Sequence, residues 1–528
     1  MSMAIFRAGR RPSNFQEENM KILKRILCLT LVALMLIPLL VACGDNTDKE
    51  GTDEVDKDLL AAEMPDDGVD FQDFGGKEIR LLGFNAASAN EFEVDAEDTG
   101  TTLKAAVFAR NQALEGRLNV KLKWDYINGH AGYESAYVTE AGSRASSGGV
   151  DIFTPYSQAG SWLMTNGVIQ DLKGEGLTYL DLSDPWWEGS FAEQCTINDK
   201  LYFTGGDISW TLMGNTIGFC FNKDILSQKA QVLEQFGVTT MYELVEQDKW
   251  TIDNFITISK AVAAKNTYGF TSYIVPMDAF YKACDMKWME VNANGQQEIS
   301  ADQGSGKVNT VLGKLSPFFR TDAVAVRLKY DSNLNYATNN GNKSNPSNPE
   351  WQNGKALFVL NAMLSITDFK FTELGFDFGV LPMPMYDSAQ GAYKTTPDFE
   401  YSIVAVPRQV QGEALTQVSA VLQVMASEGQ SRIARPYFDE VMKKQEADSA
   451  DDYTMWETIR DSIELEGGRM FAGVGGKEND GFTFITFRRS LQLSKNTINE
   501  QWDGSAQKRK DIISNMNAEM AKIEAKYD

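Results

Sequence analysis

Extended and helical patterns alternate over residues 77–156, and this alternation restricts the possible fold more than any other feature of the sequence. Short apolar or alternating runs favour strands, whereas apolar residues that recur every three to four positions favour helices. Strands are expected at 77–84, 119–124 and 149–156, and helices at 103–118 and 133–146. This order is typical of an α/β domain with a parallel sheet, whose functional loops lie at the carboxyl ends of the strands.

The rest of the chain mixes extended and helical patterns less regularly. Extended segments are expected at 200–210, 216–226, 354–360, 376–384 and 401–407, with a capped helix at 250–265 and a mainly helical C-terminal third. The stretch 331–349 is rich in Asn, Ser and Gly, so we expect a surface loop there. A chain of 528 residues is long enough for two lobes, each with its own hydrophobic core.

The first 42 residues have the features of a secretory signal peptide. A basic region opens at Met20, which we take as the true start, and the apolar run 26–41 follows it. This run is short for a membrane span and contains Pro38, so a cleaved signal fits better. It ends in "LVAC", which resembles the lipobox of bacterial lipoproteins and predicts lipidation at Cys43. The alternative is an ordinary signal peptide with an incidental cysteine.

Residues 43–75 are acidic and nearly free of aromatic side chains. Such a stretch cannot bury enough apolar surface to fold, so we expect a disordered tether. The whole chain carries a net charge of −23, which repels phosphate backbones and anionic lipid head groups. We therefore expect no nucleic-acid partner, and membrane contact only through a lipid anchor on the extracytoplasmic face.

Cysteine and histidine usage argues against several kinds of site. Outside the leader and the lipobox, the thiols are Cys195, Cys220 and Cys284, which permit at most one internal disulfide. The only histidine is His130, which excludes zinc sites with several histidines and histidine-based catalytic triads elsewhere in the chain. No phosphate-binding loop or nucleophile-elbow motif is present, so we expect neither a cofactor nor a metal.

Seven segments spread along the chain carry a family resemblance. They are "FARNQALEGRLNVKL" (108–122), "DLSDPWW" (181–187), "INDKLYFTGGDIS" (197–209), "FCFNKDIL" (219–226), "YELVEQDKWTIDNF" (242–255), "FDFGVLPMPMYDSAQGAY" (376–393) and "ARPYFDEVMKK" (434–444). Through them the sequence resembles the family 1 extracellular solute-binding proteins of bacterial ABC importers, in particular a Firmicutes-type lipoprotein branch. The chain departs from that branch at "PMYD" (384–387), where the branch often has P-K-Y-D, and in its long loop before Trp351.

The resemblance implies a type II periplasmic-binding-protein-like fold, with two α/β lobes, a ligand cleft between them and crossing hinge strands. One lobe would comprise residues 76–210 with about 402–436. The other would comprise about 214–400 with 437–528, including the C-terminal helices. The chain would cross near 210–219, return near 401–406, and cross again before the helical tail. The implied function is capture of a small polar solute, a sugar or oligosaccharide above all, by a monomer that closes around it and delivers it to an ABC permease.

Aromatic residues beside carboxylates or amides at the expected loop tips are the candidate ligand contacts. Aromatic rings stack on the C–H faces of sugars, and planar polar groups bind the hydroxyls. The candidates are Asn85, Tyr156, Ser157, Gln158, Asp207, Trp210, Trp351 and Tyr401, followed by Asp278 and Trp288.

The adjacent indoles of Trp186 and Trp187 are expected to have different roles. Successive residues of an extended segment point to opposite sides, and the preceding Pro185 favours an extended entry. We expect one indole to pack in the core of the first lobe and the other to reach the rim of the cleft.

Two other functions are compatible with the same features. A glycosidase also uses aromatic platforms, with two carboxylates about 5–10 Å apart, yet no local motif singles out such a pair. We therefore expect a binding protein and not an enzyme. A lipoprotein that presents its ligand to a sensor kinase or chemoreceptor would share every sequence feature of an importer component.

Overall fold

The computed structural model describes residues 64–85, 91–129, 133–272, 275–304, 306–325, 349–363, 374–398, 400–436, 450–471 and 506–527, and the single residues 474, 487, 490 and 491. All of them belong to the compact unit Glu54–Asp528. The predicted signal peptide, Cys43, His130 and most of the loop 331–349 lie outside the described residues. Within the described ranges, no helix is long and apolar enough to cross a membrane.

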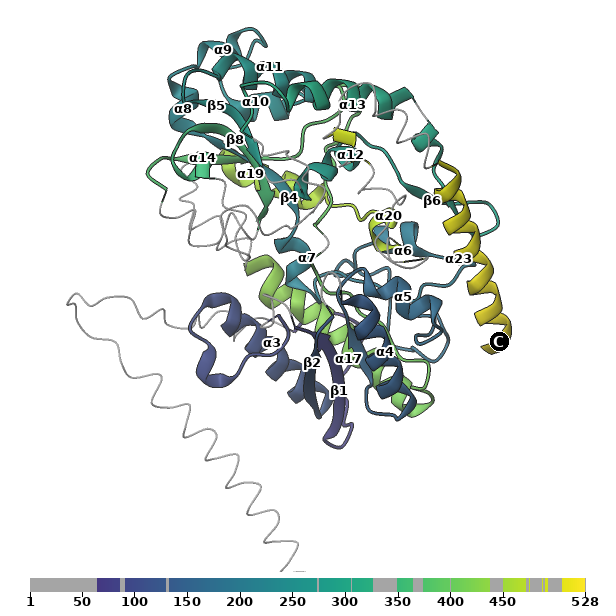
Figure 1. The fold of residues 1–528 in the computed structure, drawn as a ribbon. Helices are drawn as coiled ribbons and strands as arrows, with labels where there is room; N and C mark the ends of the chain where they lie inside the picture. The colour runs from purple at the N-terminus through teal and green to yellow at the C-terminus, as the bar shows by residue number, and fades with distance from the viewer. Residues whose placement is uncertain are drawn as a thin grey trace, which may run out of the picture. The chain divides into compact units, whose positions relative to one another are not determined.

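The first sheet contains three parallel strands, β1 (Lys77–Phe84), β2 (Val120–Ile127) and β3 (Ile152–Thr154), in the order β2-β1-β3. Helices α3 (Thr102–Leu118) and α4 (Glu134–Ser146) connect them, and Figure 1 shows α3 and α4 beside β1 and β2. The predicted order of strands and helices and the predicted parallel sheet are confirmed. The carboxyl ends of the three strands consequently lie at one edge.

Local sequence signals explain where α3 begins and ends. The side chain of Thr101 accepts a hydrogen bond from the N–H of Lys104 at 3.3 Å, which satisfies one of the free donors of the first turn. Asn119 ends the helix with a φ of 46°, in the left-handed region that asparagine tolerates better than most residues. The chain then enters β2 directly.

The second sheet contains β5 (Tyr268–Ser272), β8 (Ala356–Ala362), β4 (Ile217–Asn222) and β9 (Phe378–Leu381), in that order. β5 and β8 are parallel, whereas β4 is antiparallel to both β8 and β9. Phe219 lies at the centre of an aromatic cluster. Its ring contacts those of Trp250, Phe255, Phe270, Phe280 and Phe358 at centroid distances of 5.2–6.1 Å.

The remaining elements surround these sheets or link them. They are α5 (Ala159–Thr165), α6 (Ser190–Cys195), α7 (Trp210–Gly214), α8 (Lys223–Ser227), α9 (Gln231–Glu234), α10 (Met241–Glu246), α11 (Ile252–Val262), α12 (Ala279–Ala283), β6 (Met289–Val291), β7 (Gln297–Ile299), α13 (Gly306–Phe318), α14 (Pro349–Gln352), α17 (Glu413–Gly429), a π-helical segment (Gln430–Ala434), α19 (Ala450–Asp461), α20 (Gly467–Met470) and α23 (Ala506–Tyr527). Short 3₁₀ turns cover Ala96–Asp98, Val275–Asp278 and Ala301–Gly304. The predicted helical C-terminal third is confirmed within the described ranges.

Two of the expected extended segments are partly helical. In 216–226, β4 ends at Asn222, whose side chain accepts from the N–H of Ile225 at 2.9 Å and so begins α8. In 200–210, only Thr204 forms a bridge to the segment 401–407, and α7 then begins at Trp210. In 216–226, the cap at Asn222 therefore outweighed the apolar run that favoured a strand.

The segment 401–407 follows the first sheet without forming a continuous strand. Isolated antiparallel bridges join it to residues on three stretches of the chain: Ser402 to Tyr156, Val404 to Thr204, Ala405 to Phe153, and Pro407 to Ile169. The chain thus passes from the first sheet to β4 through α7, and returns from β9 to the first sheet through this segment. We call 209–216 and 396–407 the two crossing segments.

The predicted tether ends earlier than residue 75. Asp67 and Val69 are buried, at 5% and 2% exposure. Asp67 accepts hydrogen bonds from the guanidinium of Arg117 on α3 and from the hydroxyl of Ser427 on α17. A buried ion pair and an apolar contact fix this part of the stretch, which the acidic composition alone did not reveal.

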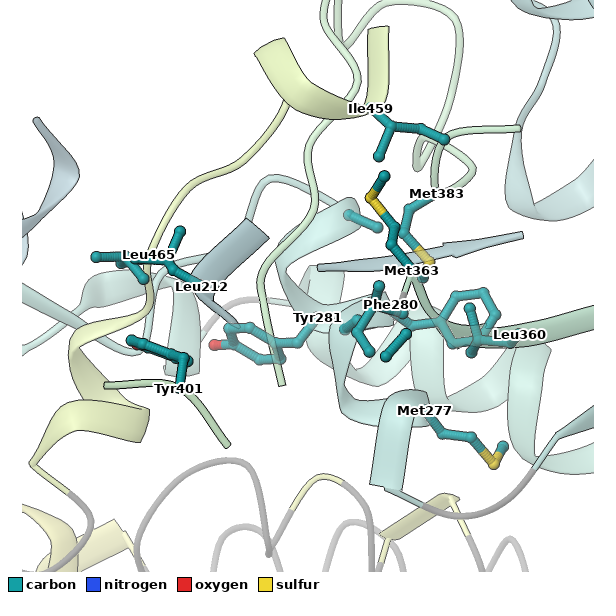
Figure 2. Packing of buried hydrophobic residues seen from close by; sticks show 14 of the residues in the cluster. Leu212, Met277, Phe280, Tyr281, Leu360, Met363, Met383, Tyr401, Ile459 and Leu465 are labelled. Atoms are coloured by element: carbon teal, nitrogen blue, oxygen red, sulfur yellow. The ribbon is translucent and has the colours of Figure 1, made fainter. Parts of the chain in front are cut away.

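One hydrophobic cluster continues from the second sheet to the crossing segments. It contains Leu360 of β8 and Phe280 of α12, and also Leu212 of α7 and Tyr401. Figure 2 shows these side chains together with those of Met363, Met383, Ile459 and Leu465. The crossing segments are therefore packed in apolar surroundings and not only held by hydrogen bonds.

Candidate functional site

The loop after β3 lies against the second crossing segment. The N–H of Ser157 donates to the carbonyl oxygen of Tyr401 at 2.9 Å, and the N–H of Ile403 donates to that of Pro155 at 3.1 Å. These reciprocal bonds continue the sheet beyond the end of β3. They bring Tyr156, Ser157 and Tyr401, three of the predicted ligand residues, to the same place.

The ends of β1 and β2 meet this loop. Tyr156 packs edge-on against Phe84, the last residue of β1, at a centroid distance of 5.7 Å. Asn85 follows Phe84, its side chain is exposed, and its N–H donates to the carbonyl oxygen of Ile127 at the end of β2 at 2.8 Å. Gln158 is half-buried next to the same loop. The predicted loop tips of β1 and β3 are thus neighbours, as a parallel sheet requires.

Negative charge gathers around Tyr156. Burial raises the pKa of its hydroxyl well above the ordinary value, and the charges of Glu400, Glu134 and Asp398 raise it further. Glu400 is exposed, but nearby protein atoms remove part of the hydration of its carboxylate, and this desolvation raises its pKa. A neutral phenol beside carboxylates can donate a hydrogen bond, while the carboxylates accept bonds from ligand hydroxyls.

A buried ion pair lies on the other side of Tyr401. The guanidinium of Arg469 in α20 bonds to the carboxylate of Asp278, and its second nitrogen lies 3.9 Å from Asp398. The charge of Arg469 counters the rise that burial causes in the pKa of Tyr401. The Tyr401 hydroxyl donates to the sulfur of Met470 at 3.1 Å. Asp278, a weaker sequence candidate, therefore belongs to this neighbourhood through a partner that the sequence did not indicate.

Asp207 has structural partners at a different position. Its carboxylate accepts from the Gln430 side chain at 2.9 Å, and its N–H donates to the carbonyl oxygen of Trp186 at 2.8 Å. Burial raises its pKa to about 6. Gln430 begins the π-helical segment after α17, and a π-helical turn is a geometry that often accompanies functional positions.

Trp210 packs in a small apolar cluster of its own. The cluster contains Val94, the α3 residues Ala106 and Val107, and Ile433 of the π-helical segment. The indole is 8% exposed at the first turn of α7. The structure therefore gives Trp210 packing contacts beside the first crossing segment.

Two other candidate tryptophans are core residues. Trp351 in α14 is fully buried and meets Phe376 and Phe378 edge to face at 5.2 and 6.3 Å. The aromatic partners enclose the indole, so it packs in the core and not at an open ligand surface. Trp288 stacks on Tyr281 at 3.5 Å, and both are buried.

Both indoles of the Trp186–Trp187 pair are buried, at 5% exposure each, in the same cluster. The expectation that one of them reaches a rim is wrong. The N–H of Trp187 donates to the carbonyl oxygen of Asp184 at 3.0 Å, so the pair lies in a turn and not in an extended segment. The Trp187 indole N–H donates to Gln423 of α17 at 3.2 Å, which satisfies its polar atom inside the core.

Sequence reasoning missed Glu91 and Arg469. Glu91 is buried at 2% exposure, and burial raises its pKa. It precedes several exposed acidic residues, and no local pattern distinguishes it from them. Arg469 lies far from the other site residues in the sequence, so only the fold brings it to Tyr401.

The chemistry of the assembled group suits binding. It offers hydroxyl and amide groups, carboxylates and one guanidinium. Within this group, no hydroxyl is paired with a histidine or other general base. Among the described residues, no group of three or more His, Cys, Asp or Glu side chains has the arrangement of a metal site. Cys195, Cys220 and Cys284 are buried free thiols.

Three solved structures serve for comparison. The cyclic α-maltosyl-1,6-maltose binding protein from Arthrobacter globiformis matches with a TM-score of 0.51 and 11% identity, over 84% of this chain and 100% of its own. A family 1 extracellular solute-binding protein from Bifidobacterium longum subsp. infantis matches with a TM-score of 0.46 and 13% identity, over 85% of this chain and 100% of its own. The galacto-N-biose-/lacto-N-biose I-binding protein of the ABC transporter from Bifidobacterium longum matches with a TM-score of 0.45 and 13% identity, over 86% of this chain and 98% of its own. Only the first superimposes well enough to support a statement about fold.

Two α/β sheets joined by crossing segments, together with that match, define the class: the chain has the type II periplasmic-binding-protein-like fold. No curated protein matches the chain. A model of the bacterial extracellular solute-binding proteins matches residues 95–428, more than half of the chain. The chain therefore belongs to the bacterial extracellular solute-binding protein family.

Proposed function

We propose that this protein captures a small polar solute, a sugar or oligosaccharide above all, at the group formed by Asn85, Tyr156, Ser157 and Tyr401. The observation that carries the proposal is the convergence of the β1 and β3 ends with the second crossing segment. This convergence brings residues from three stretches of the chain close together, which supports a shared binding site. The protein binds its ligand without chemical change.

Charge and hydrogen bonding in the group match a neutral, hydroxyl-rich ligand. Carboxylates such as Glu400 and Glu134 accept from sugar hydroxyls in charge-assisted bonds, which are stronger than neutral ones. An anionic ligand would be repelled by the same carboxylates.

Capture works through closure of two lobes. We infer that one lobe contains the first sheet with 402–436, and that the other contains the second sheet within about 214–400 together with 437–528. The contacts of Asp67 extend the first lobe toward the N-terminus. A ligand that touches both lobes only when they are closed shifts the equilibrium toward that state by its differential affinity.

The cellular setting follows from the N-terminal sequence and the family. We propose that Cys43 carries a lipid anchor, that the acidic residues after it form a tether, and that the protein acts as a monomer on the extracytoplasmic face of the membrane. The closed, loaded form would deliver its ligand to an ABC permease. The anchor and the permease are proposals that rest on "LVAC" and on the family's role in import.

A thermal-shift screen tests the ligand class. The protein from residue 64 onward is heated with glucose, maltose, maltotetraose and raffinose, and in parallel with a neutral tripeptide and spermidine. A sugar at 100 times its Kd should stabilise the folded state by about 2.7 kcal/mol and so raise Tm. If the peptide or the amine raises Tm and no sugar does, the carbohydrate assignment fails.

Scattering of X-rays by the same samples tests the mechanism. The radius of gyration should decrease when a stabilising sugar is added, because the lobes close. A sugar that raises Tm and leaves the scattering curve unchanged would contradict capture by closure while leaving sugar binding intact.

A further inference from the structure

The carboxylate of Glu91 joins both crossing segments. Its Oε1 accepts from the hydroxyl of Thr211 at 2.7 Å and from that of Ser209, and its Oε2 accepts from the hydroxyl of Ser402 at 2.6 Å. Ser209 and Thr211 lie where the chain leaves the first sheet, and Ser402 lies where it returns. One buried side chain is thus bonded to both of the crossing segments defined above.

Arg110 of α3 provides positive charge near this carboxylate. Its guanidinium is buried and donates to the carbonyl oxygens of Ile208 and Phe92, at 3.3 and 3.2 Å. Burial lowers the pKa of Arg110, and the negative charge of Glu91 partly offsets this lowering. A buried carboxylate is costly unless hydrogen bonds and an opposite charge compensate it, and both are present here.

A small pocket adjoins Glu91 at the ends of the first sheet's strands. It is lined by Gly83, Glu91, Phe92, Tyr126, Thr154 and Ser402, among others. About 10 Å³ of it is open to the centre of a water molecule, which is room for about one water. A Cβ on Gly83 would lie 2.9 Å from the Tyr126 ring and 3.2 Å from the Thr154 hydroxyl, so glycine keeps this space open.

Two buried hydroxyls belong to residues that line this pocket. The hydroxyls of Tyr126 and Thr154 make no hydrogen bond to any residue that the structure describes. A buried hydroxyl that makes no hydrogen bond is unfavourable. A site with two such hydroxyls and a carboxylate offers the two to four polar partners that a buried water needs.

We propose that the pocket binds one water molecule, and that Glu91 and this water form a polar hub that ties the ends of β2 and β3 to both crossing segments. The water accepts from the hydroxyls of Tyr126 and Thr154 and donates to the Glu91 carboxylate. Glu91 is a positioning residue in this hub. Any effect of the hub on lobe closure rests on the function proposed above, whereas the hub itself does not.

Hydrogen exchange of the ligand-free protein tests the hub without reference to any ligand. In Glu91→Gln the carboxylate's charge-assisted bonds become neutral, so amides in 207–217 and 400–407 should exchange about tenfold faster. Amides of β8 report global unfolding and should be unchanged. The matched control is Glu97→Gln, an exposed residue a short distance along the same stretch.

The water is tested directly by a high-resolution crystal structure and by Thr154→Val. The hub predicts density within hydrogen-bond distance of the Thr154 and Tyr126 hydroxyls. Valine has the same shape and lacks the hydroxyl, so Thr154→Val should lose the density and exchange faster in both crossing segments. Equal exchange in Glu91→Gln and Glu97→Gln would overturn the role of Glu91. An empty pocket, or a Thr154→Val protein more stable than wild type, would overturn the water site.

Discussion

The N–H of Ser157 lies 2.9 Å from the carbonyl oxygen of Tyr401, and this bond joins the end of β3 to the second crossing segment. It brings together two residues that the sequence predicted as ligand contacts from distant stretches. Because the second crossing segment also connects the two sheets, a ligand held here would lie where relative movement of the sheets is transmitted. The exposed Asn85 at the end of β1 is the most accessible test of that position.

Asn85→Ala should weaken binding of whichever sugar stabilises the protein in the screen. The loss of one or two hydrogen bonds to the ligand corresponds to a Kd about 5- to 30-fold higher. Isothermal titration calorimetry measures the change, and Tm without ligand should stay within about 1 °C of wild type because the side chain is exposed. Asn294→Ala, at an exposed turn between β6 and β7, is the matched control. An unchanged Kd in Asn85→Ala would remove this residue from the site.

Asp67→Asn should lower the free energy of unfolding by about 3 kcal/mol. The substitution leaves the buried Arg117 guanidinium without its nearest carboxylate, and a broken buried pair is costly. Urea unfolding followed by tryptophan fluorescence measures the effect, and Asp70→Asn at a neighbouring exposed position should change stability by less than about 0.5 kcal/mol. Equal midpoints for the two variants would show that residues near 67 do not stabilise the first sheet.

Asp207→Asn should change the pH dependence of stability. The folded state raises the pKa of Asp207 from 3.8 to about 6, so the folded protein binds this proton more tightly than the unfolded chain. Wild-type stability relative to the variant therefore falls as the pH rises from about 4 to about 6 and is constant above that range. We expect the variant to gain ~1–2 kcal/mol on wild type between pH 4 and pH 7.5. Urea midpoints at four pH values measure this, with exposed Asp322→Asn as the control. A difference that is independent of pH would contradict the raised pKa.

Trp351→Phe should reduce stability and leave ligand affinity unchanged. The indole is enclosed by Phe376 and Phe378, so its replacement by a smaller ring leaves a cavity that costs about 1–3 kcal/mol. Affinity for the sugar found in the screen should stay within twofold. A large loss of affinity with normal stability would return Trp351 to the ligand site.

The first sheet could be predicted almost completely from the sequence. The strand at 77–84 has the expected bounds, because the hydrophobic period of a segment is a local property. The roles of single aromatic residues could not be predicted. The N–H of Trp187 bonds to the carbonyl oxygen of Asp184, so the pair lies in a turn. The rule that successive side chains point to opposite sides holds for extended segments and therefore did not apply.

Local patterns also gave no means of ranking carboxylates. Glu91 and Glu97 lie in the same acidic stretch, yet one is buried with three hydroxyl donors and the other is exposed. Their difference depends on Thr211 and Ser402, which reach Glu91 only after the chain has crossed between the sheets and returned.

By itself, the sequence determined the alternation of strands and helices, the net negative charge and the family, because each depends on residue type and short-range spacing. The tertiary structure alone decided which side chains share a neighbourhood: Tyr156 with Tyr401, Asp278 with Arg469, and Glu91 with both crossing segments. Burial and hydrogen bonding between distant stretches arise from packing of the whole chain, and no local pattern of residues records them.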